Sequence, residues 1–164
     1  MTNEELTAYN KNRKIFQIGI VVKDVDEAVE QWETLYQVGP WRKVTFGQAC
    51  LKDIVAAEGA VKEGFAYRAA MTMIGDLQIE FIEANESVPI FHEFLKKTGG
   101  GLHHIKERVS DDVLPGVLKD YADRGMPPVF GAQFYNANFY FMDTVDKLGV
   151  QLEFGNCVPV KKPE

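Results

Sequence analysis

The feature that most constrains the fold is an internal repeat. The segments DLQIEF (76–81) and GVQLEF (149–154) share the pattern apolar–Gln–apolar–Glu–Phe. The segments FQIGIVVKD (16–24) and HHIKERVSD (103–111) also align, and their final aspartates coincide. Internal duplication at this scale indicates two similar structural units, and a chain of 164 residues is long enough for both to share one core.

The first half has the pattern of a βαβββ unit. Apolar and β-branched residues at 15–22 predict a buried strand, and residues 23–39 predict a helix. Asp24 is placed to cap this helix, and the apolar stripe along its inner side ends with Leu35 and Tyr36. The remaining segments are strand patterns at 41–46, 65–75 and 76–84 and an ambiguous stretch at 50–64.

The second half repeats this order of elements. Residues 102–109 predict a strand and residues 111–125 predict a helix. We therefore expect one α+β domain, in which two βαβββ repeats form an incomplete barrel around a concave pocket, either within one chain or across a homodimer. Its expected parts are a polar N-terminal arm at 1–14, the first unit at 15–86, a connecting helix and glycine loop at 87–101, the second unit at 102–156 and a polar tail at 157–164.

Composition excludes several classes of function. The formal net charge is −6, whereas a nucleic-acid surface needs clustered Lys and Arg. No apolar stretch approaches the roughly 20 residues of a membrane-spanning helix, and the N-terminal segment MTNEELTAYNKNRK lacks the apolar core of a signal peptide. Cys50 and Cys157 have no zinc-ligand spacing, and we expect a reduced pair rather than a disulfide. These features predict a soluble cytoplasmic protein with no membrane or nucleic-acid partner.

The repeat also selects a candidate site. Aligning the halves places Gln17 opposite His104 and Glu80 opposite Glu153, on four different strands. One imidazole, one amide oxygen and two carboxylates are ligands that a divalent metal accepts, and together with such an ion they form a neutral site. Two buried carboxylates without a cation would repel each other. We therefore expect a concave metal-binding pocket that holds Zn, Ni, Co, Mn or Mg through Gln17, Glu80, His104 and Glu153.

Each of these residues also has an ordinary structural explanation. A single histidine on a strand is more often packed in the core than bound to a metal, and Gln or Glu in an alternating strand usually faces solvent. The joint occurrence at equivalent positions of two repeats favours the metal site. His103 points to the opposite face from His104 because side chains alternate along a strand, so we assign it no chemistry.

Lys106 and Arg108 share the face of His104. Two interpretations are open for them. Either the strand frays and both side chains extend outward into solvent, or they anchor an anion or supply an additional acid or base beside the metal. Glu107, on the opposite face, occupies a position where an apolar residue is expected.

Other residues are weaker candidates. His92 on the connecting helix is expected to face solvent. Aromatic residues on the predicted strands belong either to the pocket wall or to the core: Tyr67, Phe134, Phe139 and Phe141. Three acidic residues in the ambiguous segment either solubilise a loop or include a general base: Asp53, Glu58 and Glu63.

Five segments carry a resemblance to a known family: IGIVVKDVDEAVEQW, VGPW, LQIEFIEA, GGGLHHI, and FMDT with LGVQLEF. Over residues 15–156 the chain resembles the vicinal oxygen chelate superfamily, especially its methylmalonyl-CoA epimerase and glyoxalase-like branch. The metal ligands of that family fall at the positions of Gln17, Glu80, His104 and Glu153. The first is commonly His in relatives, and the position of Lys106 is small or apolar in the epimerases.

The resemblance implies a metal-dependent epimerase, isomerase or lyase that abstracts a proton next to a carbonyl of an acyl-CoA or 2-oxo compound. Glu80, Glu153 and Lys106 are then the catalytic candidates, and the substrate is a small molecule, either anionic or neutral. A non-catalytic binding protein of the resistance type would use the same pocket. A ring-cleaving dioxygenase needs iron held by two His and one carboxylate, and His104 is the only histidine at a ligand position.

Overall fold

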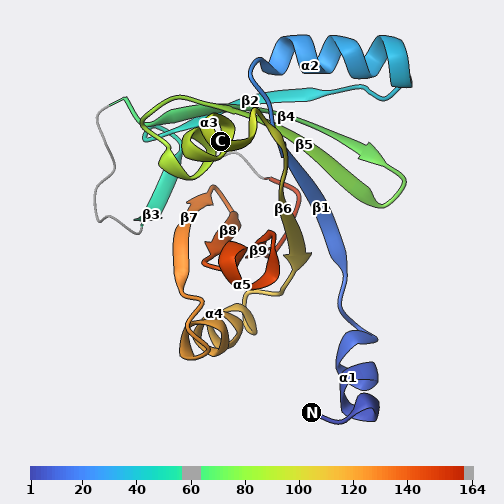
Figure 1. The fold of residues 1–164 in the computed structure, drawn as a ribbon, viewed down its shortest axis with the longest axis vertical. Coiled ribbons are helices and arrows are strands. Elements are labelled where there is room, and N and C mark those ends of the chain that lie inside the picture. The colour runs from blue at the N-terminus through green and yellow to red at the C-terminus, as the bar shows by residue number, and fades with distance from the viewer. Residues whose placement is uncertain (57–63, 161–164) are drawn as a thin grey trace.

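Nine strands form one curved sheet that closes nearly into a barrel (Figure 1). A computed structural model describes residues 1–56 and 64–160 of the chain. The strands are β1 (Ile15–Val21), β2 (Arg42–Gly47), β3 (Leu51–Ala56), β4 (Ala66–Ile74), β5 (Leu77–Ala84), β6 (Gly101–Arg108), β7 (Pro128–Phe134), β8 (Ala137–Met142) and β9 (Gln151–Gly155). Within the described residues their order in the sheet is β2-β4-β5-β1-β6-β9-β8-β7-β3.

The helices are short and surround this sheet. They are α1 (Asn3–Asn10), α2 (Val25–Gln31) with the π-helical turn η1 (Trp32–Tyr36), α3 (Pro89–Thr98), α4 (Leu114–Asp123) and α5 (Val145–Leu148). None of the helices in the described part of the chain is both long enough and apolar enough to span a membrane. The polar arm of the sequence contains α1, none of whose residues is buried.

The two halves have the same strand order. In each, the first strand pairs in parallel with the last, β1 with β5 and β6 with β9. Beyond this pair lie β4 and then β2 in the first half, and β8 and then β7 in the second. With β3 left aside, the order is β1-β5-β4-β2 in one half and β6-β9-β8-β7 in the other. The halves join through the antiparallel β1–β6 ladder. The predicted fold class, α+β with a repeated unit and an incomplete barrel, is confirmed.

One strand departs from this symmetry. β3 lies in the segment with an ambiguous sequence pattern, and it pairs with β7 of the other half, with Leu51 opposite Phe134 and Ala56 opposite Phe130. A register shift interrupts the ladder near Asp53, whose φ is +49°. Because a turn connects β2 directly to β3, the two outermost strands of the sheet are neighbours in the chain, which brings the ends of the sheet together.

The predicted helix at 23–39 is regular only in its first part. The Asp24 side chain accepts hydrogen bonds from the backbone N–H groups of Asp26 and Glu27, as expected for a cap. The last turn, Trp32–Tyr36, is π-helical, and this wider turn changes the direction of the side chains within it. The inward orientation predicted for Leu35 and Tyr36 is therefore wrong, since they are 83% and 61% exposed.

The outer face of the sheet packs on the helices, and the inner face surrounds an aromatic cluster. Ile79 and Phe81 of β5 pack with Val25 and Val29 of α2. In the second half, Phe154 of β9 packs with buried residues of α4 in the same way. A helix therefore covers the apolar face of β5 and of β9, which are the last strands of the two halves. The opposite, polar face of these strands lies on the concave side of the barrel. Both cysteines are free, as expected.

Candidate active site

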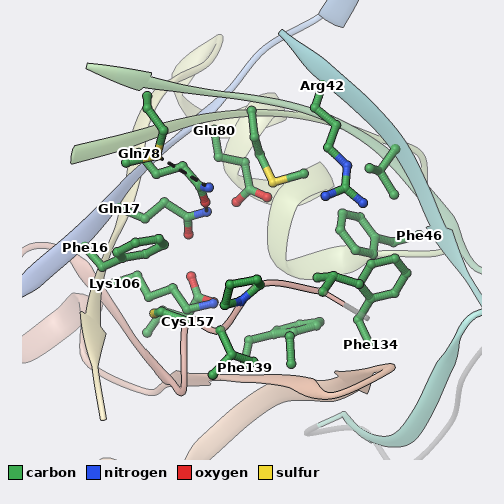
Figure 2. Close-up of a pocket in the computed structure, with 18 of the residues that line it drawn as sticks. Phe16, Gln17, Arg42, Phe46, Gln78, Glu80, Lys106, Phe134, Phe139 and Cys157 are labelled. Atoms are coloured by element: carbon green, nitrogen blue, oxygen red, sulfur yellow. Dashed lines mark hydrogen bonds and ion pairs between the residues drawn. The ribbon is translucent and has the colours of Figure 1, made fainter. Parts of the chain in front are cut away.

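The concave side of the barrel encloses a cavity of about 890 Å³ (Figure 2). Its lining comes from both halves of the same chain, including Gln17 and Glu80 from the first half and Lys106 and Glu153 from the second. The pocket therefore forms within one chain. A homodimer is still a prediction.

The structure brings the four predicted ligands together at one end of this cavity. The Nε2 atom of His104 lies 3.1 Å from Oε2 of Glu153, 3.4 Å from Oε2 of Glu80 and 3.4 Å from Oε1 of Gln17. All four residues are buried, and His104 is 0% exposed. We call Gln17, Glu80, His104 and Glu153 the acceptor cluster, because three oxygen atoms of the hydrogen-bond acceptor type surround one imidazole nitrogen.

Strand register explains the convergence. β1 lies between β5 and β6, with Gly19 opposite Glu80 on one side and opposite His104 on the other. β9 adjoins β6, where Glu153 pairs with Lys106. Gly19 leaves the space that the imidazole fills, because a Cβ there would lie 1.7 Å from Cε1 of His104. The repeat does not identify Gly19, although a glycine inside an apolar strand is a known signal of such a close approach.

The oxygen atoms of the acceptor cluster that face His104 are acceptors, so none of them offers a hydrogen to the others. Gln17 donates its amide N–H to Oε1 of Gln78 at 2.6 Å, so its own Oε1 faces His104. Oε2 of Glu153 is buried and accepts no hydrogen bond within the described residues. A hydrogen on Nε2 of His104, or a cation placed among these oxygens, would satisfy them.

The donor chemistry of the acceptor cluster fits a divalent cation, since nitrogen and oxygen ligands from four strands point at one place. In residues 1–56 and 64–160, however, no group of three or more His, Cys, Asp and Glu side chains is arranged so that it could hold a metal ion. In the acceptor cluster, the oxygens lie 3.1–3.4 Å from Nε2 of His104, which are hydrogen-bond distances.

Lys106 points into the site rather than into solvent. Its Nζ lies 2.7 Å from Oε1 of Glu153, and its side chain is 12% exposed. Burial alone would lower the pKa of Lys106, but the attraction of Glu153, with smaller contributions from Cys157 and Glu80, makes the net change an increase. Lys106 therefore stays charged beside a carboxylate. The interpretation in which the strand frays and Lys106 extends outward is wrong, because Glu153 supplies a buried partner that strand alternation does not reveal.

Two arginines complete the cationic part of the cavity lining. The Arg108 guanidinium lies over the ring of Phe16, 4.6 Å from its centre. Arg42 extends from β2 into the cavity on the side away from Lys106 (Figure 2). Among the described lining residues, these three cationic side chains face only two carboxylates, although the whole chain has a net charge of −6. The cavity is therefore electrostatically suited to an anion.

The middle of the cavity is apolar. The sequence allowed four aromatic residues to belong either to the pocket wall or to the core. All four contribute to the lining of the cavity: Tyr67, Phe134, Phe139 and Phe141. Tyr67 is also part of the core, where burial and then the nearby charge of Glu80 raise the pKa of its hydroxyl well above the usual value. An apolar wall with charged groups at its ends is typical of small-molecule sites.

His103 is buried on the far side of His104, away from the cavity. Its Nδ1 lies 3.1 Å from Nδ1 of His104, and its Nε2 lies 3.3 Å from the carbonyl oxygen of Ile90. Its ring packs on Phe91 and Phe94. Burial, with a smaller effect of His104, lowers the pKa of His103 to about 3, so the ring is neutral. The sequence predicts that His103 faces away from the cavity but does not reveal its contact with His104.

The other candidate residues that the structure describes do not line the cavity. Glu107 binds Arg13 of the N-terminal arm through both carboxylate oxygens, which explains a charged residue at a position where an apolar one is expected. Asp53 is exposed on β3. Glu58 and Glu63 lie outside the described residues. His92 is half-buried with Nδ1 enclosed, so its predicted orientation toward solvent is wrong.

A family model described as the Glyoxalase/Bleomycin resistance protein/Dioxygenase superfamily matches residues 16–142. A structure of a Streptomyces coelicolor methylmalonyl-CoA epimerase variant in complex with 2-nitronate-propionyl-CoA is similar, with a TM-score of 0.65 and 22% identity over 92% of this chain and 98% of that chain. The methylmalonyl-CoA epimerase from Mycobacterium tuberculosis has a TM-score of 0.64 and 21% identity, covering 88% of each chain.

A hypothetical protein from Bacillus halodurans C-125 is also similar, with a TM-score of 0.60 and 20% identity over 93% of this chain and 97% of that one. No curated protein sequence matches the chain. At these levels of identity the structural neighbours show a shared fold.

Proposed function

Because the chain belongs to the Glyoxalase/Bleomycin resistance protein/Dioxygenase superfamily, we propose that it is a metal-dependent enzyme that moves a proton next to a carbonyl group. The reaction is an epimerisation, an isomerisation or a lyase step on an acyl-CoA or 2-oxo compound. One observation carries this proposal: the three accepting oxygens of the acceptor cluster surround Nε2 of His104 at the wall of a cavity of about 890 Å³.

The acceptor cluster would hold the metal through Oε1 of Gln17, Nε2 of His104 and the Oε2 atoms of Glu80 and Glu153. The bound ion would supply Lewis-acid stabilisation of the negative charge that develops on the substrate oxygen. Zn, Ni, Co, Mn and Mg all accept this combination of donors. The amide of Gln17 is a harder and weaker ligand than an imidazole, which favours the metals that prefer oxygen.

The two carboxylates are not equivalent as bases. Glu153 is held by Lys106 through Oε1, whereas Glu80 projects into the cavity from the opposite wall (Figure 2). We assign the removal of the substrate proton to Glu80, and Glu153 would take the matching role on the other face of the carbon when its Oε2 is released from the metal. Lys106 uses one of its N–H groups on Glu153, so the others are free to bind the anion that forms.

The lining supports an acyl-CoA or a 2-oxo acid as the substrate. Its cationic groups suit a phosphate or a carboxylate, and its aromatic middle suits an acyl chain. The neighbour from Streptomyces coelicolor was seen with 2-nitronate-propionyl-CoA, which supports the same class of ligand.

A second function, non-catalytic binding of a small molecule, is favoured by one specific feature. Lys106 already neutralises Glu153, so a metal is less needed to keep the buried carboxylates apart. The ring-cleaving dioxygenase is disfavoured because the acceptor cluster contains one histidine, whereas that chemistry uses two.

Hydrogen–deuterium exchange distinguishes the two functions. Metal-loaded protein is incubated in D₂O with methylmalonyl-CoA and, separately, with a 2-oxo acid, and mass spectrometry follows deuterium at the carbon next to the carbonyl. The wild-type enzyme is expected to speed exchange. Glu80→Gln is expected to slow exchange by about 10²–10⁴-fold while it still binds the acyl-CoA or the 2-oxo acid. Glu93→Gln, an exposed carboxylate on α3, is the control. Binding of these compounds by calorimetry without any exchange would support the binding protein instead.

A further inference from the structure

His103 and His104 are neighbours in the chain, yet their rings meet. The β1–β6 ladder pairs Gly19 with His104 and then Ile20 with Leu102, so His103 has no opposite residue on β1 and forms a bulge. A bulge changes the direction in which a side chain points, compared with the regular alternation along a strand. The ring of His103 consequently lies beside that of His104, with the two ring centres 5.4 Å apart.

The hydrogen bonds of this pair have only one consistent direction. The carbonyl oxygen of Ile90 can only accept, so Nε2 of His103 carries the hydrogen and donates to it across 3.3 Å. A neutral histidine has one N–H group, and a second hydrogen would make His103 a cation packed against the rings of Phe91 and Phe94, which offer no negative charge to balance it. Its Nδ1 is therefore a lone pair. The facing Nδ1 of His104, 3.1 Å away, must carry the hydrogen of their shared bond.

This direction determines which nitrogen His104 turns toward the acceptor cluster. With Nδ1 committed as a donor to His103, Nε2 is the nitrogen that faces Gln17, Glu80 and Glu153, where it donates a hydrogen to these oxygens or offers its lone pair to a cation placed among them. The opposite tautomer, which free neutral histidine prefers, would place a hydrogen on Nε2 and remove the lone pair from the site. The ring of His103 is itself held by Phe91, Phe94 and Phe141 on three sides.

We propose that His103 is a positioning residue that holds His104 in the Nδ1–H tautomer, so that Nε2 is available as a ligand in the cavity. This inference deepens the proposed function, which uses Nε2 of His104 as a ligand. The use of Nε2 as a ligand rests on that function, whereas the contacts that set the direction of the hydrogen bond between the two rings need neither a metal nor a substrate.

Long-range ¹H–¹⁵N NMR of the full-length chain tests the tautomer directly. The sequence contains only three histidines, so their imidazole signals can be assigned by substitution of His92. The spectra are recorded with and without added Zn²⁺. The expected result is that Nδ1 of His104 carries a hydrogen with and without Zn²⁺, and that Nε2 is the nitrogen whose signal changes when Zn²⁺ is added. A neutral His104 with hydrogen on Nε2 in the wild type would overturn the proposal.

Two variants separate positioning from packing. His103→Phe keeps an aromatic ring against Phe91 and Phe94 but removes the acceptor, and His103→Asn places its Oδ1 where the imidazole carries Nδ1. His103→Phe is expected to move His104 toward the Nε2–H form and to weaken Zn²⁺ binding by about 10–100-fold, with His103→Asn recovering both properties. An unchanged tautomer in His103→Phe would contradict the proposal. If Zn²⁺ fails to bind the wild type while His104 keeps the Nδ1–H form, the proposed function fails and this inference stands.

Discussion

Gly19 lies directly against the imidazole of His104 across the β1–β6 ladder, at a distance that no side chain could occupy. Gly19→Ala would place a Cβ 1.7 Å from Cε1 of His104 and must push the ring away from the acceptor cluster. We expect a loss of about 1–3 kcal/mol in the free energy of unfolding, together with loss of metal binding. Urea denaturation measures the first effect and equilibrium dialysis the second.

Gly116→Ala is the matched control, because a Cβ added at that position of α4 meets nothing within 4 Å. It should leave metal binding unchanged and stabilise the protein by about 0.5–1 kcal/mol, since alanine favours a helix over glycine. Equal effects of the two substitutions would show that the contact between Gly19 and His104 has no special role.

The buried pair of Lys106 and Glu153 predicts a stability change that depends on the metal. Lys106→Met leaves a buried carboxylate without its partner, a change that costs about 3–5 kcal/mol when nothing replaces the lost cation. A divalent ion in the acceptor cluster would offset part of this cost. The drop in Tm caused by Lys106→Met should therefore be larger in chelated protein than in metal-loaded protein.

Lys119→Met serves as the control for this prediction, since Lys119 and Asp123 form an exposed pair on α4. Its Tm should match that of the wild type with and without metal. A Lys106→Met protein that loses the same Tm in both conditions would mean that the ion and the ammonium group do not act on the same carboxylate.

Cys157 offers a pH-dependent probe of the cavity that it lines. Burial, which outweighs the attraction of Lys106, raises the pKa of the Cys157 thiol. At a given pH, a smaller fraction of Cys157 than of an ordinary thiol is in the thiolate form. Alkylation of Cys157 by iodoacetamide should therefore reach half its maximal rate at a higher pH than alkylation of N-acetylcysteine. The measurement uses Cys50→Ser protein, in which Cys157 is the remaining cysteine, and mass spectrometry.

An acyl-CoA in the cavity should slow this alkylation, because ligand and reagent compete for the same space. A half-maximal rate at or below the pH found for N-acetylcysteine would contradict the raised pKa. Unchanged alkylation in the presence of saturating ligand would place the ligand elsewhere.

Much of the candidate site is predictable because its pattern is local and repeated. Alternation along a strand defines which residues share a face, and the repeat supplies the long-range relation between Gln17 and His104 and between Glu80 and Glu153. Register then brings these residues together on adjacent strands. The roles assigned to them, and the bound metal, are predictions that depend on chemistry rather than on fold.

The features that the sequence does not reveal depend on contacts between remote or irregular segments. β3 pairs with a strand of the other half, and the left-handed Asp53 interrupts its alternation. The contact of His103 with His104 arises from a bulge in β6. Leu35 and Tyr36 lie in a π-helical turn that a regular helical period cannot anticipate. In each case one irregular backbone step changes where a side chain points.

Metal content is the most direct test of whether the acceptor cluster holds a divalent cation. Full-length protein is purified without chelator, dialysed against Zn²⁺ or Co²⁺, and measured by mass spectrometry of the metal per chain. About one ion per chain is expected in the wild type and in Glu93→Gln, and none in Glu153→Gln, because Glu153 supplies the buried oxygen without a donor. A wild-type protein that binds no metal, or a Glu153→Gln protein that binds as much, would contradict the proposed site.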